Sequence, residues 1–430
     1  MTFEQRFERD LPLILDDIAM GPYPDYVNDV LSTTAHGRQR PGWTFPGRWL
    51  PMELTTARVP TARWPMRQLG VLALLAILVA AMLAAYIGTH QQRVPPPFGP
   101  AANGLIAATR DGDLYAVDPR TGRDTLVLGG PTKDEWVGFT PDGTLGVFVR
   151  WGPDSGATTT GKLGTLLLGS SSPPVFIDKD VIHGDSAVDM APNGREVAFT
   201  TYDEGTPRQL IIVAALDGST YHRFDDVPIT DYGGVTYLAP NGDELLYIAR
   251  SANNETHDIR ALDVTTGRTR SIVETTTATD IFGGISASPD GKRLAYALQD
   301  RETLGVELHV IGIDGRDDKV VGHAQGASFE AWPLWDPQGK RLLIERGQPG
   351  EDFARPVIVD AAGGPDVLVQ TAITSDGAWK QWAPDGSSIL AQRTVNGKEL
   401  GEELWDATTG AVTPASWPAS TVGGWQRVAP

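Results

Sequence analysis

The sequence predicts an all-β protein: a seven-bladed β-propeller, preceded by one transmembrane helix and a short α-helical cytoplasmic segment. A six-bladed ring is the alternative. Three observations predict this organisation: one long uncharged apolar stretch, a turn motif that recurs at even spacing, and two partial repeats at the ends of the repetitive region. We expect four parts, namely a cytoplasmic helical segment with a basic aromatic linker (residues 1–67), the transmembrane helix with its flanks (68–92), a Pro-rich spacer (93–103) and the propeller (104–430).

The composition limits the classes of protein that this chain can be. It has 430 residues, 48 Gly, 32 Pro, no Cys and a formal net charge of −18. A chain without cysteine has no disulfides, no Cys-ligated zinc, no iron–sulfur cluster and no thiol nucleophile. The negative charge argues against nucleic acid as a partner.

The first 36 residues predict two short helices. Apolar residues recur at helical spacing on one face, although Pro12 starts or kinks the first helix. Two helices this short cannot bury a core alone, so they either pack weakly on each other or bind a partner, in which case we expect the binding face to be made of Phe7, Leu11 and Ile14. Residues 40–51 are aromatic, basic and Pro-rich, and predict either contact with the membrane interface or an extended linker.

A transmembrane helix is predicted over the apolar residues 69–87, because the stretch 68–92 carries no formal charge. About 19 helical residues span roughly 28 Å, close to the thickness of the bilayer's hydrocarbon core. A buried core helix is the alternative, and a cleaved signal peptide is disfavoured by the 67 residues that precede the stretch.

The flanking charges predict the orientation of this helix. Six Arg residues and one acid, Glu53, lie between residues 38 and 67, whereas Arg93 stands alone after the apolar stretch. Positive charge gathers on the cytoplasmic side of membrane helices. We therefore expect the N-terminus inside and the propeller outside the cytoplasmic membrane.

A short turn motif, Pro followed by Asp, Asn or Gln and then Gly, recurs 47 to 51 residues apart. Its prolines are Pro141, Pro192, Pro240, Pro289, Pro337 and Pro384. Pro presets the second position of a turn, and Gly accepts the positive φ that returns the chain into a paired strand. Alternating apolar runs follow each turn, as in strands. Repeats of 40–50 residues with four strands each predict propeller blades.

The two ends of the repetitive region predict one further, shared blade. Residues 105–128 contain three strands without a first strand, and residues 422–428 form a first strand alone. Asn103 and Gly104 supply the half of the turn that is missing after Pro430. A blade closed in this way leaves no exposed sheet edge at the junction.

The repeat block that begins Ser288-Pro-Asp-Gly and continues to Tyr296 resembles the repeat of TolB-like, WD-type β-propellers of bacteria. The resemblance covers about three quarters of the chain. It implies the fold, and it implies a role among periplasmic interaction proteins, sensor ectodomains or propeller caps of peptidases. The order of short helices, membrane helix and outer domain resembles membrane-bound anti-sigma factors in layout, without their zinc-binding His/Cys pattern.

Catalytic motifs are missing from the sequence. It contains no Gly-x-Ser-x-Gly elbow, no phosphate-binding Walker loop and no His-Glu-x-x-His, and its 7 His residues are scattered. From this we predict that the protein is not an enzyme and that it holds no metal and no cofactor. Calcium in an Asp-rich turn such as Asp111-Gly-Asp113 stays open, although the spacing of an EF-hand is absent. A propeller enzyme with an unrecognised site is an alternative.

Tryptophan recurs five residues before the repeat Pro, at Trp136, Trp332, Trp379 and Trp425. The first strand of a blade lines the central channel, so these rings are candidates for binding a sugar, an aromatic compound or a peptide at the channel mouth. Packing between blades is the alternative explanation of the same pattern.

These observations predict an envelope sensor or regulator. Its propeller is expected to bind a protein, small-molecule or glycan ligand outside, and its N-terminal helices a sigma-factor-like regulator inside. A membrane-tethered propeller scaffold with a passive N-terminal anchor is the alternative.

Overall fold

The computed structural model divides the chain into two compact units, Met1–His90 and Gln91–Pro430. It describes residues 99–429 except for gaps at 153–159, 178–181, 184–185, 203–208, 228–234, 238–241, 252–254, 323–328, 348–352, 372, 375–378 and 396–397. The predicted cytoplasmic helices and the predicted transmembrane stretch lie outside these residues. Within residues 99–429, gaps aside, no helix is long and apolar enough to cross a membrane.

The described part of the second unit is all-β, as predicted, and its strands form six sheets. Four sheets have four antiparallel strands each. They are β31 (Thr421–Val428), β1 (Ala102–Arg110), β2 (Asp113–Val117) and β3 (Asp124–Leu128); β9 (Val188–Met190), β10 (Glu196–Tyr202), β11 (Gln209–Ala215) and β12 (Tyr221–Phe224); β13 (Val235–Tyr237), β14 (Glu244–Arg250), β15 (His257–Asp263) and β16 (Thr269–Val273); and β27 (Lys380–Trp382), β28 (Ser388–Val395), β29 (Lys398–Asp406) and β30 (Val412–Pro414).

The two remaining sheets are larger. One has five strands, β4 (Lys133–Phe139), β5 (Leu145–Trp151), β6 (Thr160–Leu167), β7 (Val175–Phe176) and β8 (Ile182–His183). The other has ten, β17 (Thr279–Ile281), β18 (Ser286–Ala287), β19 (Arg293–Asp300), β20 (Val306–Gly312), β21 (Lys319–Val320), β22 (Phe329–Trp335), β23 (Arg341–Gly347), β24 (Phe353–Asp360), β25 (Val367–Leu368) and β26 (Ile373–Thr374). A single parallel pair, Val306 with Phe329, joins its two halves.

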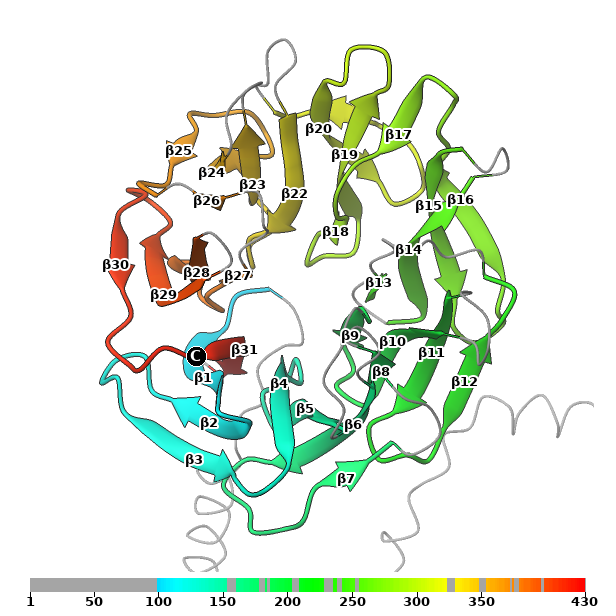
Figure 1. Cartoon of the computed structure of the whole chain (residues 1–430). Helices are drawn as coiled ribbons and strands as arrows, with labels where there is room; N and C mark the ends of the chain where they lie inside the picture. The colour runs from blue at the N-terminus through cyan, green and yellow to red at the C-terminus, as the bar shows by residue number, and fades with distance from the viewer. Residues whose placement is uncertain are drawn as a thin grey trace, which may run out of the picture. The chain divides into compact units, whose positions relative to one another are not determined.

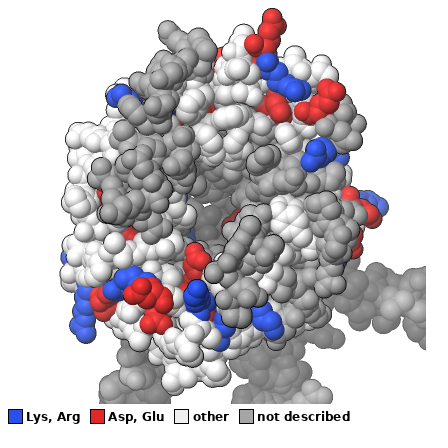
Figure 2. All heavy atoms as spheres, in the orientation of Figure 1, with Lys and Arg blue, Asp and Glu red and all other residues white. Residues whose placement is uncertain are grey.

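The strands are arranged radially around a centre (Figure 1). Strands β31, β4, β9, β13, β18, β22 and β27 lie nearest that centre, and each is followed outward by the next strands of its group. Figure 2 shows a hollow at the centre of this face. The first strand of each predicted repeat therefore faces the middle of the ring.

The closing sheet, β31-β1-β2-β3, confirms that the two chain ends share one sheet. β31 pairs antiparallel with β1, from Ala102 opposite Val428 to Thr109 opposite Thr421, and Figure 1 shows the red C-terminal strand beside the cyan β1. The predicted role of Asn103 and Gly104 as half of a turn is wrong. Both lie inside β1, because pairing between two separate chain segments needs no covalent turn.

The recurring motif forms the predicted turns. In the first, the Gly143 N–H donates to the Thr140 carbonyl at 2.7 Å, and Gly143 has a φ of 70°. That conformation favours glycine. The residue before Pro also caps the returning strand, since the Ser288 hydroxyl oxygen accepts from the Arg293 N–H at 3.0 Å. The six residues from Ser288 to Arg293 therefore form both the turn and the start of the strand that follows it.

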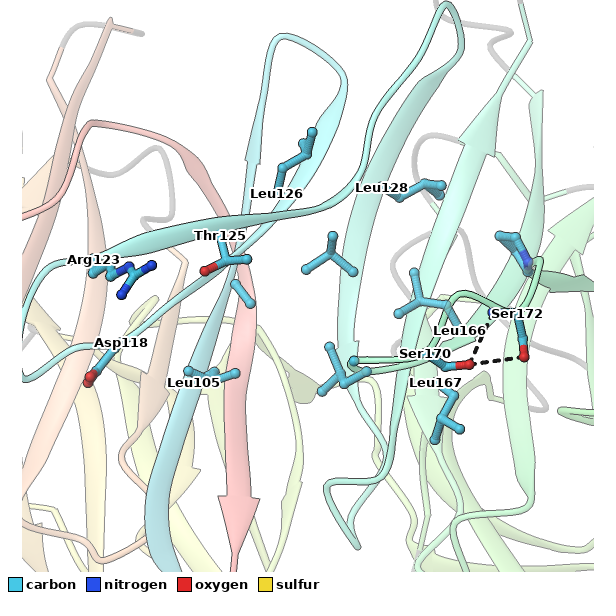
Figure 3. Close-up of a pocket in the computed structure, with 15 residues that line it drawn as sticks. Leu105, Asp118, Arg123, Thr125, Leu126, Leu128, Leu166, Leu167, Ser170 and Ser172 are labelled. Atoms are coloured by element: carbon cyan, nitrogen blue, oxygen red, sulfur yellow. Dashed lines mark hydrogen bonds between the residues drawn. The ribbon is translucent and has the colours of Figure 1, made fainter.

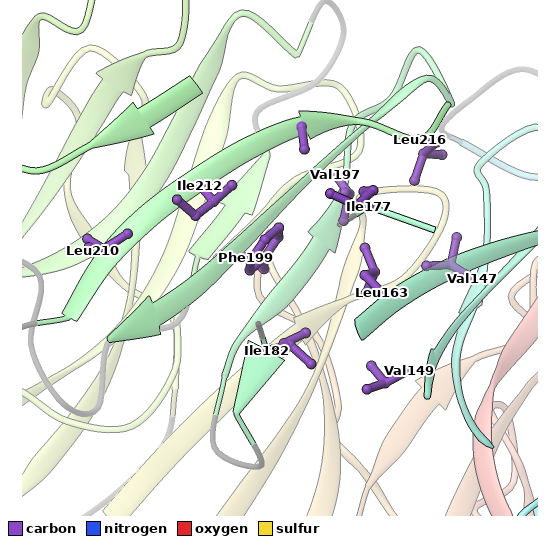
Figure 4. Close-up of a cluster of buried hydrophobic side chains, with 11 residues drawn as sticks. Val147, Val149, Leu163, Ile177, Ile182, Val197, Phe199, Leu210, Ile212 and Leu216 are labelled. Atoms are coloured by element: carbon purple, nitrogen blue, oxygen red, sulfur yellow. The ribbon is translucent and has the colours of Figure 1, made fainter. Parts of the chain in front are cut away.

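Neighbouring sheets bury their apolar faces against each other. Figure 4 shows one such cluster, in which Val147 and Leu163 of β5 and β6 pack with Phe199 and Ile212 of β10 and β11. Burying one side chain of this size stabilises the fold by about 1.5–3 kcal/mol. Because the apolar faces of each sheet are covered by the neighbouring sheets, an open ring would leave two of these faces exposed, and closure of the ring stabilises the fold.

Candidate functional site

The four candidate tryptophans occupy different environments although they share one repeat position. Trp136 and Trp425 are buried, each 5% exposed, and Trp379 is half-buried against the core that contains Trp425. The Trp136 indole donates to the Tyr115 carbonyl at 2.9 Å, so its ring joins two neighbouring sheets. Trp332 differs, because 41% of it is exposed.

A second pair of tryptophans, two residues before the repeat Pro, also packs between neighbouring repeats. The Trp382 indole donates to the Leu334 carbonyl at 3.0 Å, and the Arg341 guanidinium lies 5.0 Å from the Trp382 ring centroid. Arg341 also donates to the Gly386 carbonyl and pairs with the buried Asp336. Trp335 makes the same kind of contact with Ser286 and Arg293. These tryptophan side chains therefore link neighbouring repeats around the circular arrangement of sheets.

Trp332 has an unusual backbone. Its φ is 52°, a left-handed value that costs a non-glycine residue about 1–2 kcal/mol. The register of β22 against β23 shifts between Ala331 and Leu334, and Pro333 removes one backbone donor at the same place. Strained backbone of this kind persists where the surroundings fix it, and it concentrates at functional sites. Here it turns a large aromatic ring toward solvent.

Two phenylalanines support the Trp332 ring. Phe282 lies 5.5 Å and Phe329 lies 6.0 Å from it, both edge-on, and the three rings form what we call the aromatic cluster. A Cβ added to Gly283 would lie 3.2 Å from the indole nitrogen, so this glycine lets the ring lie against the backbone. The contacts with the two phenylalanine rings and the close approach to Gly283 therefore hold the indole ring in place.

A fixed and partly exposed indole is suited to stacking. The faces of aromatic rings bind sugars, aromatic compounds and peptide side chains, and such rings are frequent anchors in binding sites. Sequence reasoning identified Trp332 but missed Phe282 and Phe329. Both precede a repeat turn by seven or eight residues, and aromatic residues in adjoining first strands were the available signal.

Two histidines form pairs with carboxylates. His257 Nδ1 lies 2.9 Å from an Asp280 carboxylate oxygen. His309 Nδ1 lies 3.2 Å from Asp318, which also accepts from the Tyr296 hydroxyl, and burial raises the pKa of Tyr296. No group of three or more His, Asp or Glu residues suited to a metal ion occurs among the described residues.

The partner-binding residues predicted in the cytoplasmic helix, Phe7, Leu11 and Ile14, lie outside the described residues. Their role stays a prediction, as does ligand binding by the four tryptophans.

Comparison with known proteins identifies the fold. No family model matches the chain, and no curated protein matches it. Among solved structures, TolB from Acinetobacter baumannii is 15% identical over 75% of this chain and 81% of its own, with a TM-score of 0.46. Oligogalacturonate lyase in complex with manganese is 15% identical over 73% of this chain and 85% of its own, with a TM-score of 0.51. A prolyl endopeptidase is 12% identical over 82% of this chain, with a TM-score of 0.52.

The likeness to the lyase and the endopeptidase shows a β-propeller fold, and TolB proteins are also among the matching structures. This chain spans only 55% of the prolyl endopeptidase. The comparisons contradict the prediction that the protein is not an enzyme, because a lyase and an endopeptidase carry this fold. A search for local motifs misses sites assembled from several sheets, and a fold does not determine a function.

Proposed function

We propose that the protein is a single-pass membrane protein whose extracytoplasmic propeller binds a ligand at the aromatic cluster. Its N-terminal helices would then engage a cytoplasmic, sigma-factor-like regulator. The propeller would follow the membrane helix through the Pro-rich spacer, within the four parts that the sequence predicts. The apolar residues 69–87 and the Arg residues before them support the membrane anchor and its orientation.

We also propose seven blades for the ring. Six repeat turns, the shared closing sheet and the two halves of the ten-stranded sheet support this count. Seven is the number obtained when each half of that sheet is one blade.

The observation that carries the binding proposal is Trp332. It is the one tryptophan among the large apolar side chains that the described residues expose, and its strained backbone keeps it exposed. An apolar ring held in solvent at a cost in stability is expected where a ligand later covers it. The ligand would be a glycan, a small molecule or a peptide.

An immobilised panel of oligosaccharides and peptides tests this proposal. The purified protein should bind one class of probe, and Trp332→Ala should weaken that binding at least tenfold, because truncating an aromatic anchor costs about 2 kcal/mol or more. Trp379→Ala is the matched control, since Trp379 shares the repeat position but is half-buried. Binding that survives Trp332→Ala, or is lost equally in both variants, would contradict the assignment.

The same panel addresses a propeller enzyme as the second candidate, which the likeness to a lyase and an endopeptidase favours. Probe turnover that depends on residues other than Trp332 would support catalysis over binding alone.

A further inference from the structure

A second surface lies on the outer side of the ring, away from the first strands. A cavity of about 580 Å³ separates β3 of the closing sheet from the chain that follows β6. We call it the edge groove. Leu105, Leu126, Leu128, Leu166 and Leu167 line it, and Figure 3 shows the leucines of β3 and of the end of β6 on its two sides. Its volume falls within the range of ordinary ligand sites.

The strand β3, which lines one side of the groove, is also the outermost strand of the closing sheet. The closing sheet runs in the order β3-β2-β1-β31, so one edge of β3 has no strand beside it in the described structure. Free edges attract further strands, and proteins usually protect them with charged residues, with proline or by keeping them very short. Four other outermost strands carry such residues, namely Arg223 in β12, Arg270 in β16, Lys319 in β21 and Pro414 in β30, and the outermost strands β7 and β25 are only two residues long.

β3 lacks this protection over most of its length. After Asp124, which pairs with Arg110, its residues are Thr125, Leu126, Val127 and Leu128. Leu126 is 54% exposed. An apolar strand with a bare edge is the arrangement that domains recognising extended peptides present to their ligands.

The opposite wall is apolar because the turn that follows β6 lacks the Asp found in other repeats, although the Ser170 N–H still donates to the Leu167 carbonyl at 3.2 Å. Other repeats follow the third strand with an Asp-containing turn, as at Asp263 and Asp406, whereas β6 ends in Leu166 and Leu167 and is followed by Leu168. Leu167 is 51% exposed. Ser170 and Ser172 hydrogen-bond to each other beyond it and close this wall.

We propose that the edge groove binds an extended segment of a partner protein, apolar in its middle and flanked by basic residues, which adds to β3 as a further strand. The bare edge of β3 would supply backbone hydrogen bonds, and the two leucine walls would take alternate side chains of the segment. The basic flanks follow from charge. The chain carries −18, which attracts a basic partner and repels a second copy of itself.

The lining of the groove itself is nearly neutral. Among the described residues, Asp118 and Arg123 are its only charged lining residues, and no charge lies between the leucines. The middle of the segment therefore meets an uncharged surface and its ends meet an acidic protein. This surface is separate from the aromatic cluster, so the inference does not depend on the function proposed there.

Selection from a displayed library of random 12-residue peptides tests the inference on the full-length protein. Peptides that alternate apolar residues and carry Lys or Arg at their ends should be enriched. Leu126→Lys and Leu167→Lys should each weaken binding of an enriched peptide at least tenfold, because both place a charge on the groove. Neither change should unfold the protein, since both side chains are about half exposed.

Leu368→Lys is the matched control. Leu368 is 60% exposed and lies on β25, an outermost strand far from the groove in the ring. It should bind the enriched peptide as the wild type does. An enriched peptide with proline at its two central positions should lose binding, because proline cannot donate to β3.

Three results would overturn the inference. The first is no enrichment, or enrichment of peptides without alternation. The second is equal binding to the wild type and to Leu126→Lys. The third is a concentration-dependent dimer that Leu126→Lys dissociates, which would assign the edge groove to a second copy of the chain.

Discussion

Replacing Trp425 by alanine tests whether the C-terminal strand closes the ring. Trp425 lies in β31, is 5% exposed and packs in one core with Ile106 of β1 and Leu390 of β28. Its indole donates to the Gly104 carbonyl at 3.3 Å. The side chain therefore joins the C-terminal strand both to the N-terminal strand and to the preceding sheet.

The size of the effect follows from this burial. Truncating a buried Trp to Ala costs about 3–5 kcal/mol. Unfolding about 340 residues at roughly 2.1 cal/mol/K each gives an entropy near 0.7 kcal/mol/K, so the midpoint should fall by about 4–7 °C. Deleting residues 422–430 should cost more, because it also removes the paired backbone of β31 and the buried Val422.

Thermal unfolding of the fragment Gln91–Pro430, followed by circular dichroism, measures both changes. Trp332→Ala is the control, since this ring is 41% exposed and its loss should shift the midpoint by less than half as much. A Trp425→Ala variant that melts within a degree of the wild type would refute closure by this strand. A truncated fragment that melts within a degree or two would refute it equally.

Three further predictions concern other parts of the molecule. Arg341→Leu should destabilise the propeller by about 1.5–3 kcal/mol in urea unfolding, because it leaves the buried Asp336 carboxylate without its cation. Arg316→Leu, at a side chain 83% exposed, should change stability by less than about 0.5 kcal/mol, and equal effects would contradict the assignment. The Thr409 N–H lowers the pKa of Asp406 below its ordinary value of 3.8. The stabilisation is therefore complete well above pH 3.8 and is lost as the pH falls through the lowered pKa, and Asp406→Asn should reduce this acid dependence in unfolding curves. Changing three residues of the predicted cytoplasmic helix to Asp should abolish recovery of a cytoplasmic partner in pull-downs, namely Phe7, Leu11 and Ile14. A wild-type segment that recovers no partner would favour the passive anchor.

Much of the fold could be predicted because each repeat carries its own turn. The Pro and Gly of the motif specify backbone angles directly, and the strands on either side follow from alternation. Even the shared closing sheet could be predicted from spacing, since the repeat length is nearly constant. The misplaced turn at Asn103 shows the limit. A sequence that resembles half of a turn does not show that two unconnected segments of the chain pair with each other and need no turn.

The candidate site was less predictable, because exposure depends on local backbone. Trp136 and Trp332 occupy the same repeat position, yet one is buried and the other is 41% exposed. The backbone differs at this position, because Trp332 has a left-handed φ and precedes Pro333, whereas a register shift occurs beside Trp136 as well as beside Trp332. The supporting Phe282 and Phe329 come from two neighbouring repeats, and only the folded ring brings them together.

Reporter fusions test the proposal that one membrane helix anchors the propeller outside the cytoplasm. A reporter that is active only outside the cytoplasm would be fused after Pro51 in one strain and after Pro97 in another. The Arg residues before residue 69 predict a silent reporter after Pro51 and an active one after Pro97. The reverse pattern would place the propeller in the cytoplasm and contradict the proposed sensor.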